Sequence, residues 1–445
     1  MEEVKKVPRR IAQTLISSLK GGVVPRIGLP YITVGRRREV EALLKDIEMI
    51  EEGGASFRFI VGKYGAGKSF LLQSIRNYAM DRDMVVVDAD LSPERRLQGS
   101  GGQGLATYRE LIGNMSVKTK PEGGALTIVL DRWIQTVQSE VASGEGISPD
   151  DPSFEEKTEQ RIYGVIRSMN DMVHGFDFAR VISLYYKAYV NDDDDIRAKA
   201  IRWLRGEYST KSEAKADLGV TSYISDDDWY EYLKLFAGFF RKAGYKGMLV
   251  FIDELVNIYK VPNSITRQYN YEKILTMYND AMQGKAHFIG TVMCGTPQAI
   301  EDSRRGVYSY EALRSRLSEG KFATAGVQDL LAPVIKLEPL TAEEMLVLTE
   351  KLANIHSGLY GYEDILSESD LADFIRIEYG RIGADTSITP REVIRDFIEL
   401  LDIIYQNPGM KPADLLGSER FSYAKPEIGS GDSMPSDDMF AEFKL

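Results

Sequence analysis

The sequence has very little of the residues that build disulfides and structural metal sites. Among its 445 residues there are one cysteine, Cys294, and three histidines. A single cysteine excludes an internal disulfide and a Cys-rich zinc site, and the three widely spaced histidines leave little for a His-based metal centre. This composition predicts a reducing, cytoplasmic compartment. Cys294 follows an apolar run, so we expect it in the core.

Long apolar runs and an excess of positive charge are also missing. No stretch approaches the ~18 apolar residues of a membrane span, and the N-terminus lacks the apolar segment of a signal peptide. We therefore expect a soluble protein without membrane contact. There are 55 Lys+Arg and 67 Asp+Glu, a net charge of −12, which excludes binding to nucleic acid through bulk charge. Because residues 340–445 carry this excess, a local basic surface elsewhere stays possible.

What is present is a series of short apolar segments alternating with helical patterns, which predicts an α/β fold built on a parallel sheet. The segments expected to be strands are 56–61, 84–88, 248–252, 287–294 and 334–337. Residues 92–247 are predicted to form a mostly helical insertion, with helices expected near 126–141, 158–174, 176–189 and 229–243. Acidic runs at 192–195 and 226–228 are expected to be turns or helix starts. Three helices are expected between residues 340 and 405.

Residues 62–69, GKYGAGKS, match the phosphate-loop pattern G-x-x-x-x-G-K-[ST] between an expected strand and an expected helix. In such a loop, backbone N–H groups at the helix N-terminus bind phosphate oxygens. Lys68 would reach the β- and γ-phosphates, and the Ser69 hydroxyl would ligate Mg²⁺. The predicted nucleotide-binding residues of this segment are Gly62, Lys63, Tyr64, Gly65, Ala66, Gly67, Lys68, Ser69 and Phe70. ATP and Mg²⁺ are therefore the expected cofactors.

Two further strands end in polar residues that suit the same chemistry. The strand 248–252 is followed by Asp253, which would hold Mg²⁺ through water, and by Glu254, which would polarise an attacking water. This acidic pair favours an ATP-hydrolysing enzyme over a small-molecule kinase. The strand 287–294 leads to Thr296, a candidate to sense the γ-phosphate. A simple turn is the alternative for Thr296.

These motifs resemble the AAA+ family, and more closely its initiator-type, origin-recognition-like clade. Val34-Gly35-Arg36 is similar to the segment whose backbone lines the adenine pocket. Residues 314–317, RSRL, resemble the element whose arginine reaches into a neighbouring subunit as an arginine finger. The resemblance implies Arg316 for that role, with Arg314, Arg304 and Arg305 as substitutes and an ordinary surface salt-bridge cluster as the alternative. It also implies that Arg391 is a second sensor in a lid.

The resemblance divides the chain into four parts. These are an N-terminal arm (1–30), a P-loop AAA+ ATPase domain (31–339) that includes the insertion, a helical lid domain (340–405) and an acidic tail (406–445). The tail is expected to be disordered. Its segment 437–443, DDMFAEF, suits docking in a basic groove with an apolar floor on a partner, with an inert tail as the alternative.

The finer pattern, including the long helical insertion and RRGVYSYEALRSRL, resembles the ATP-binding proteins of BREX-type phage-defence systems. That resemblance implies an antiviral role, self-association, and DNA, a superfamily-II helicase and in related systems a TerB-like protein as partners. Initiator-type ATPases usually carry a C-terminal winged helix, for which too few residues remain after 405. Any DNA contact would then come from the insertion, the N-terminal arm or a ring pore.

Two hypotheses about the function remain open. The first is an ATPase that hydrolyses ATP at subunit interfaces and acts with a helicase on DNA, as a loader or remodeller. The second is an ATP-gated scaffold or signalling NTPase that binds partner proteins without motor activity or direct DNA contact. An arginine finger supplied by a neighbouring subunit distinguishes them, because a monomeric switch does not need one.

Overall fold

The computed structural model describes residues 7–144, 146–167, 169, 172–318, 329–363, 365–380 and 389–417. The chain divides into two compact units. The sheet unit consists of Arg37–Lys63 and Lys68–Leu337, and the helical unit consists of Met1–Arg36, Tyr64–Gly67 and Glu338–Leu445. The segment 437–443, expected to dock on a partner, lies outside the described residues. Within the described ranges, no helix is long and apolar enough to cross a membrane.

The sheet unit contains a five-stranded parallel sheet in the order β2-β3-β4-β1-β5. Its strands are β1 (Ala55–Val61), β2 (Val85–Asp90), β3 (Met248–Asp253), β4 (Ile289–Gly295) and β5 (Val334–Lys336). Every residue of β1 and β4 is buried, including Cys294, as expected for strands covered on both faces. The register pairs Val61 with Gly295 and Asp90 with Asp253, so the carboxyl ends of these strands share one edge. The expected α/β fold with a parallel sheet is confirmed.

All five strands are confirmed with boundaries that differ by one or two residues from the sequence prediction, and the start of β4 and the end of β2 differ most. β4 begins at Ile289 rather than at residue 287, because Phe288 has a left-handed backbone with φ of 57° that a strand cannot contain. β2 continues to Asp90, two residues beyond the predicted end, with Ala89 buried and Asp90 exposed. The two aspartates of β2 interrupted the apolar run from which its end was predicted.

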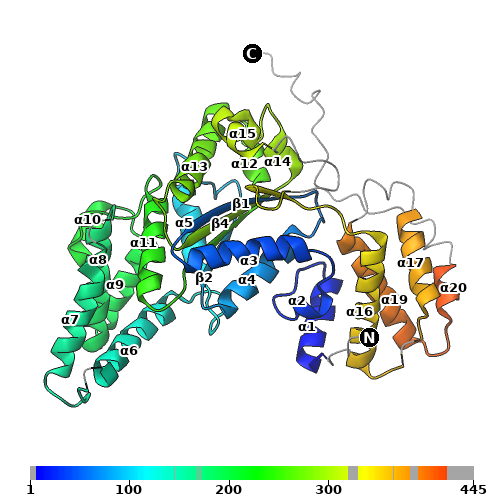
Figure 1. Ribbon diagram of the computed structural model, residues 1–445, viewed down its shortest axis with the longest axis horizontal. Helices are drawn as coiled ribbons and strands as arrows, with labels where there is room; N and C mark the ends of the chain where they lie inside the picture. Colours follow the sequence, from blue (N-terminus) through cyan, green and yellow to red (C-terminus); the bar gives the residue numbers. More distant parts are fainter. Residues whose placement is uncertain are drawn as a thin grey trace. The chain divides into compact units, whose positions relative to one another are not determined.

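Helices cover both faces of the sheet. The connection from β1 to β2 leads to one edge of the sheet, and the connections that follow lead from that edge back across the sheet. Because such crossovers are right-handed, the helices of the first connection and those of the later connections lie on opposite faces. Figure 1 shows α3 (Arg37–Glu51) and α4 (Lys68–Asp81) on one side and α13 (Ser264–Met282) on the other. Both α3 and α13 pack on β1. Three short helices follow the strand ends: α12 (Val256–Tyr259), α14 (Pro297–Glu301) and α15 (Glu311–Leu317).

The insertion between β2 and β3 is mostly helical, as expected. Its helices are α5 (Gln103–Gly113), α6 (Leu126–Gly144), α7 (Phe154–Arg167), α8 (Gly175–Val190), α9 (Asp194–Leu204), α10 (Lys211–Leu218) and α11 (Trp229–Lys242). The helix expected over 158–174 ends at Arg167, and α5, α9 and α10 were not among the expected helices. The acidic run before α9 is a helix start, because the Asp193 side chain accepts a hydrogen bond from the Ile196 N–H. α10 buries only Ala214 and Leu218, too few for a clear helical period.

The insertion shares its hydrophobic core with the sheet. Figure 1 shows α6–α10 gathered in a bundle, with α5 and α11 between the bundle and the sheet. α11 supplies buried aromatic residues, among them Phe239, whose ring lies edge-on to Trp133 of α6 at 5.0 Å between centroids. Buried residues of the bundle and of the sheet form one continuous cluster. The insertion therefore packs as a continuous part of the sheet unit.

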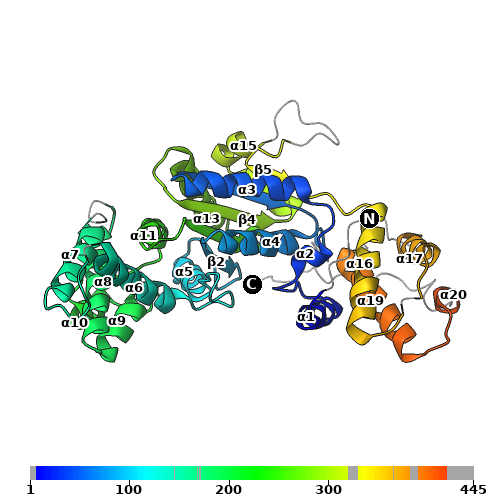
Figure 2. The same ribbon diagram turned by 60° about the horizontal axis from the view of Figure 1, so that its bottom comes forward.

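The helical unit contains α1 (Arg9–Lys20), α2 (Leu29–Ile32), α16 (Ala342–Tyr360), α17 (Glu368–Gly380), α19 (Pro390–Gln406) and α20 (Pro412–Leu416). α16 and α19 each begin with a capping box, built on Thr341 and Thr389. α1 packs on α16 and α19, and Figure 2 shows it beside them. The Lys20 ammonium donates a hydrogen bond of 2.6 Å to Asp402 of α19. Residues near the N-terminus thus pack with residues almost 400 positions later.

Candidate nucleotide-binding site

The predicted phosphate loop connects β1 to the first turn of α4. Gly62 follows β1, and its N–H bonds to the Gly295 carbonyl oxygen at 3.2 Å. Lys68 opens α4, and its ammonium donates to the carbonyl oxygens of Gly62 at 2.9 Å and Lys63 at 3.0 Å. Burial lowers the pKa of Lys68, although the charges of Asp253 and Glu254 act in the opposite direction. The amine is thus held beside the helix N-terminus, where anions bind favourably.

The Ser69 hydroxyl and the Asp253 carboxylate approach each other from different elements. Ser69 Oγ lies 3.5 Å from Asp253 Oδ2, and Asp253 Oδ1 accepts a hydrogen bond of 2.7 Å from the Glu254 N–H. Burial raises the pKa of Asp253, while the Glu254 N–H and Lys68 oppose that rise. Hydroxyl and carboxylate oxygens are suitable Mg²⁺ ligands. The described residues contain no group of three or more His, Cys, Asp or Glu able to hold a metal, and Mg²⁺ typically uses only one or two protein carboxylates beside phosphates and water.

Glu254 has an unusual backbone. Its φ is 61°, a left-handed conformation that costs a non-glycine residue about 1 kcal/mol or more. Such strain concentrates at functional sites, where surrounding contacts enforce it. Burial raises the pKa of the Glu254 carboxyl, and the charges of Asp253 and Asp90 raise it further.

Asp90 is a residue of this edge that the sequence analysis missed. It ends β2 directly beside Asp253, and its charge raises the pKa of Asp253 as well as that of Glu254. The alternation Val87-Asp88-Ala89-Asp90 at the end of an apolar run was the available signal. Three carboxylates, rather than two, therefore act electrostatically on one another.

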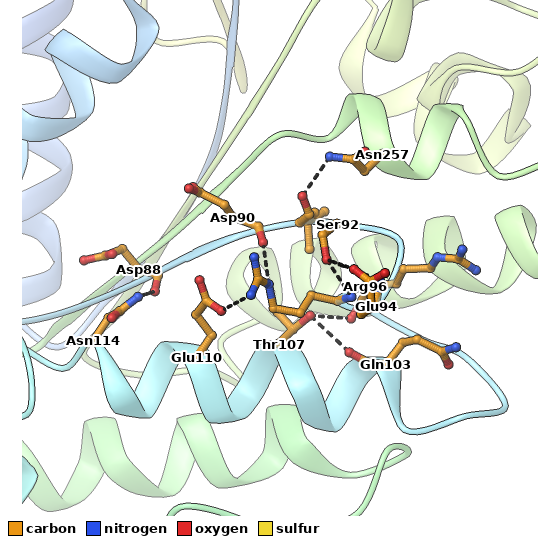
Figure 3. Close-up of polar contacts among 12 residues, drawn as sticks. Asp88, Asp90, Ser92, Glu94, Arg96, Gln103, Thr107, Glu110, Asn114 and Asn257 are labelled. Carbon is orange, nitrogen blue, oxygen red and sulfur yellow. Dashed lines mark hydrogen bonds and ion pairs between the residues drawn. The ribbon is translucent and has the colours of Figure 1, made fainter. Parts of the chain in front are cut away.

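The loop after Asp90 is tied to neighbouring elements by a set of polar contacts, drawn in Figure 3. Arg95 donates from Nε to the Asp90 carbonyl oxygen at 3.0 Å and forms an ion pair of 2.6 Å with Glu110 of α5. The Asn257 amide, on α12, donates to the Leu91 carbonyl oxygen at 2.7 Å. The first residues of the insertion are thus attached both to α5 and to the helix that follows Glu254.

Thr296 follows β4, which lies between β1 and β3 in the sheet. Its hydroxyl accepts a hydrogen bond of 3.2 Å from the Ala299 N–H and caps α14. The turn role that the sequence analysis left as an alternative is therefore present, at the strand edge expected for a phosphate sensor.

In the helical unit, Arg36 contacts the tip of the phosphate loop, residues 64–67. Its guanidinium donates to the carbonyl oxygens of Ala66 at 2.9 Å and Glu338 at 2.6 Å. Gly35 has a φ of 64°, and a Cβ there would lie 2.6 Å from Glu344 Oε1. The left-handed backbone therefore favours glycine at position 35, whereas the Glu344 carboxylate is the end of a flexible side chain and could move aside.

Arg391 also contacts the loop tip. Its Nη1 donates a hydrogen bond of 3.0 Å to the Tyr64 hydroxyl, and its guanidinium carbon lies 5.5 Å from the centroid of the Tyr64 ring. Gly65 has a φ of 77°, and a Cβ there would lie 2.5 Å from Thr389 Cβ. Arg36 thus contacts a carbonyl oxygen of the loop tip, Arg391 contacts the Tyr64 side chain, and Thr389 lies close to Gly65.

The candidate finger arginines differ in their surroundings. Arg316 is exposed on α15 and donates to the Ala312 carbonyl oxygen at 2.7 Å. The guanidinium of Arg314, also exposed, has no hydrogen bond or ion pair with any residue that the structure describes. Arg305 donates to the Tyr259 and Val261 carbonyl oxygens and lies over the Tyr259 ring, so it holds α12 in place. Arg304 contributes its backbone N–H to Asp302.

Residues 7–420 of the chain match the family described as BREX system ATP-binding protein BrxC/D. The chain belongs to this family. The likeness to BREX ATP-binding proteins inferred from the motifs is therefore confirmed, with ATP as the nucleotide and phage defence as the setting. Among curated proteins, none matches the chain.

Proposed function

We propose that this BREX-family protein is a Mg²⁺-dependent ATPase that hydrolyses ATP at interfaces between identical subunits. It acts with a superfamily-II helicase on DNA, as a loader or remodeller, and a TerB-like protein is a possible further partner. The observation that carries the proposal is the approach of Ser69 Oγ to Asp253 Oδ2, 3.5 Å, at the strand end that also bears Glu254. A hydroxyl, a metal-binding acid and a base are the groups that phosphoryl transfer to water requires.

In the proposed reaction, backbone N–H groups of residues 62–69 bind the phosphates, and Lys68 adds its charge at the β- and γ-phosphates. Ser69 and Asp253 hold Mg²⁺, which neutralises phosphate charge when bound. Glu254 accepts a proton from a water whose oxygen attacks the γ-phosphorus. The bond between the γ-phosphorus and the β–γ bridging oxygen breaks, and ADP and phosphate leave. The raised pKa of Glu254 makes it a stronger base than an ordinary glutamate.

We further propose that an arginine of α15 reaches the ATP of a neighbouring subunit. Arg316 is the first candidate from the resemblance, and the unengaged guanidinium of Arg314 makes it an equal one. Thr296 and Arg391 would respond to the γ-phosphate, from the end of β4 and from α19.

An ATP-gated scaffold is the second candidate function. The hydrogen bond from Asn257 to Leu91 favours it, because this bond attaches the insertion to the helix after Glu254. A nucleotide-dependent shift at Glu254 would then reach a large surface on which a partner protein could bind, without motor activity or direct DNA contact.

The dependence of ATPase rate on protein concentration separates the two functions. If hydrolysis occurs between subunits, the specific ATPase activity should rise with protein concentration. It should also fall about 100-fold or more in Arg316→Ala or Arg314→Ala. Arg38→Ala, at an exposed position of α3, is the matched control. A concentration-independent rate that survives both α15 substitutions contradicts the inter-subunit model and favours the scaffold. The particle size of the Glu254→Gln variant with ATP tests whether the subunits assemble. The same measurement with DNA added tests whether the assembly acts on DNA.

A further inference from the structure

We infer that Tyr64 is a positioning residue that fixes the Arg391 guanidinium at the phosphate-loop tip, where it meets the γ-phosphate of ATP. This inference rests on the proposed ATPase function. Tyr64 makes two contacts with the same group, a hydrogen bond of 3.0 Å from Nη1 and a ring contact of 5.5 Å to the guanidinium carbon. In the described part of the chain, Tyr64 is the only hydrogen-bond partner of this guanidinium.

The base of the Arg391 side chain is already fixed by its helix. Arg391 is the second residue of α19, after the N-cap Thr389 and Pro390 at the first helical position. Thr389 and Glu392 form a reciprocal capping box, which sets the backbone at this point. The Arg391 stem also passes Gly22, where a Cβ would lie 3.5 Å from Arg391 Cδ. Only the guanidinium needs a further contact to hold it, and Tyr64 provides that contact.

Nothing in phosphate binding by the loop backbone requires an aromatic residue at position 64. Tyr64 is 59% exposed, so its ring contributes little to the hydrophobic core. The neighbouring Gly65 and Gly67 contribute a left-handed backbone conformation, with φ of 77° and 87°. The contact with Arg391 therefore accounts for a tyrosine at this position, since both its ring and its hydroxyl are used.

A neutral partner leaves the arginine able to bind phosphate. A guanidinium has five N–H donors, and the Tyr64 hydroxyl takes one of them. A carboxylate in the place of Tyr64 would compete with phosphate for the charge, whereas a phenol does not neutralise it. Holding the side chain beforehand also lowers the entropy that ATP binding would otherwise cost. Tyr64 therefore favours ATP over ADP, because only ATP carries the γ-phosphate.

The test compares the affinities of the full chain for ATP and ADP by titration calorimetry with Mg²⁺. Tyr64→Leu removes the ring and the acceptor, and it should weaken ATP binding about tenfold while ADP binding stays unchanged. Tyr64→Phe keeps the ring and should give a smaller loss. Arg391→Ala should lose at least as much ATP affinity as Tyr64→Leu does. The double variant should bind ATP with the same affinity as Arg391→Ala alone. Tyr78→Leu, at an exposed tyrosine of α4, is the control.

Two outcomes would overturn the inference while leaving the ATPase proposal intact. One is an equal loss of ATP and ADP affinity in Tyr64→Leu, which would mean that Tyr64 only shapes the loop. The other is additive losses in the double variant, which would mean that the two residues act separately. If the parent chain binds neither nucleotide, or if Lys68→Ala binds ATP as well as the parent does, the proposed function itself fails and this inference with it.

Discussion

The Asn257 side chain donates a hydrogen bond of 2.7 Å to the carbonyl oxygen of Leu91. The Leu91 N–H in turn bonds to the Asp253 carbonyl oxygen at 3.1 Å. Leu91 opens the insertion, Asp253 ends β3, and Asn257 belongs to the helix after Glu254. The start of the insertion is therefore bonded on both sides to the segment that carries the proposed metal ligand and base.

Replacing Asn257 with leucine should loosen this attachment, because the Leu91 carbonyl loses a donor that is worth about 1 kcal/mol. We expect faster hydrogen exchange in residues 91–103, and a smaller change in their exchange when ATP is added. Mass spectrometry of exchange with and without ATP measures both effects. Asn279→Leu on α13 is the control, and identical exchange in the two variants would contradict the attachment.

Lys68→Ala should remove ATP binding, because it deletes the ammonium held at the N-terminus of α4. We expect affinity to fall by about 100-fold or more, as for the loss of a charge-assisted contact in a buried site. Calorimetric titration with ATP measures the change. Lys45→Ala, at an exposed position of α3, should bind as the parent does. Parental affinity in Lys68→Ala would refute the assignment.

Glu254→Gln should separate binding from hydrolysis. The two side chains have the same shape, but an amide cannot accept the proton of the attacking water, so hydrolysis should fall about 100- to 1,000-fold. ATP affinity should stay within about threefold, since Glu254 is not expected to bind phosphate. Phosphate release and ATP titration report the two effects. Glu272→Gln on α13 is the control, and hydrolysis at the parental rate would show that the base lies elsewhere.

Breaking the buried ion pair between Arg58 of β1 and Asp46 of α3 should cost the sheet unit more stability than breaking an exposed pair. Both its hydrogen bonds are 2.6 Å, and Arg58 also donates to the carbonyl oxygens of Leu331 and Ala332. Arg58→Met leaves a buried carboxylate unpaired and should cost about 3–5 kcal/mol. Arg37→Met breaks the exposed pair with Glu41 and should cost under about 1 kcal/mol. Denaturant unfolding measures both, and equal costs would contradict this ranking.

The Lys20–Asp402 pair should make the stability of the helical unit depend on pH. Burial raises the pKa of Asp402, but hydrogen bonds from Lys20 and from buried His356 outweigh it and lower the pKa overall. A carboxyl with a lowered pKa stabilises the fold above its usual value of about 4, and that contribution is lost as pH falls through the lowered value.

Lys20→Met should therefore lower the melting temperature at pH 7, and the difference from the parent should shrink as pH falls below about 4. Thermal unfolding monitored by circular dichroism from pH 7 to pH 3 measures this. Lys411→Met is the control, because the Lys411 side chain makes no capping bond at α20. A difference that stays constant over this range would show that the ion pair contributes nothing.

Much of the local structure could be predicted from the sequence. Five apolar segments bounded by turn residues predicted the strands, and the helical periodicity after residue 340 predicted α16, α17 and α19. The phosphate-loop motif and the acidic pair after β3 predicted that Lys68, Ser69 and Asp253 lie at the ends of helices or strands. This was possible because both motifs are formed by residues that are adjacent in the sequence. The errors fell where local signals are weak, and they include the polar helix α10, the neighbouring α9, the end of α7 at Arg167, the extension of β2 to Asp90 and the start of β4 at Ile289.

The sequence by itself determined which segments become strands and helices and where a phosphate loop can form. Tertiary structure decided the order of the strands, and so which strand ends meet. It placed Asp90 beside Asp253, packed α1 against α16 and α19, and engaged Arg305 and Arg391 with tyrosines while leaving Arg314 unengaged among the described residues. These relationships join residues far apart in the chain. They follow from the packing of whole elements, which no local pattern of residues records.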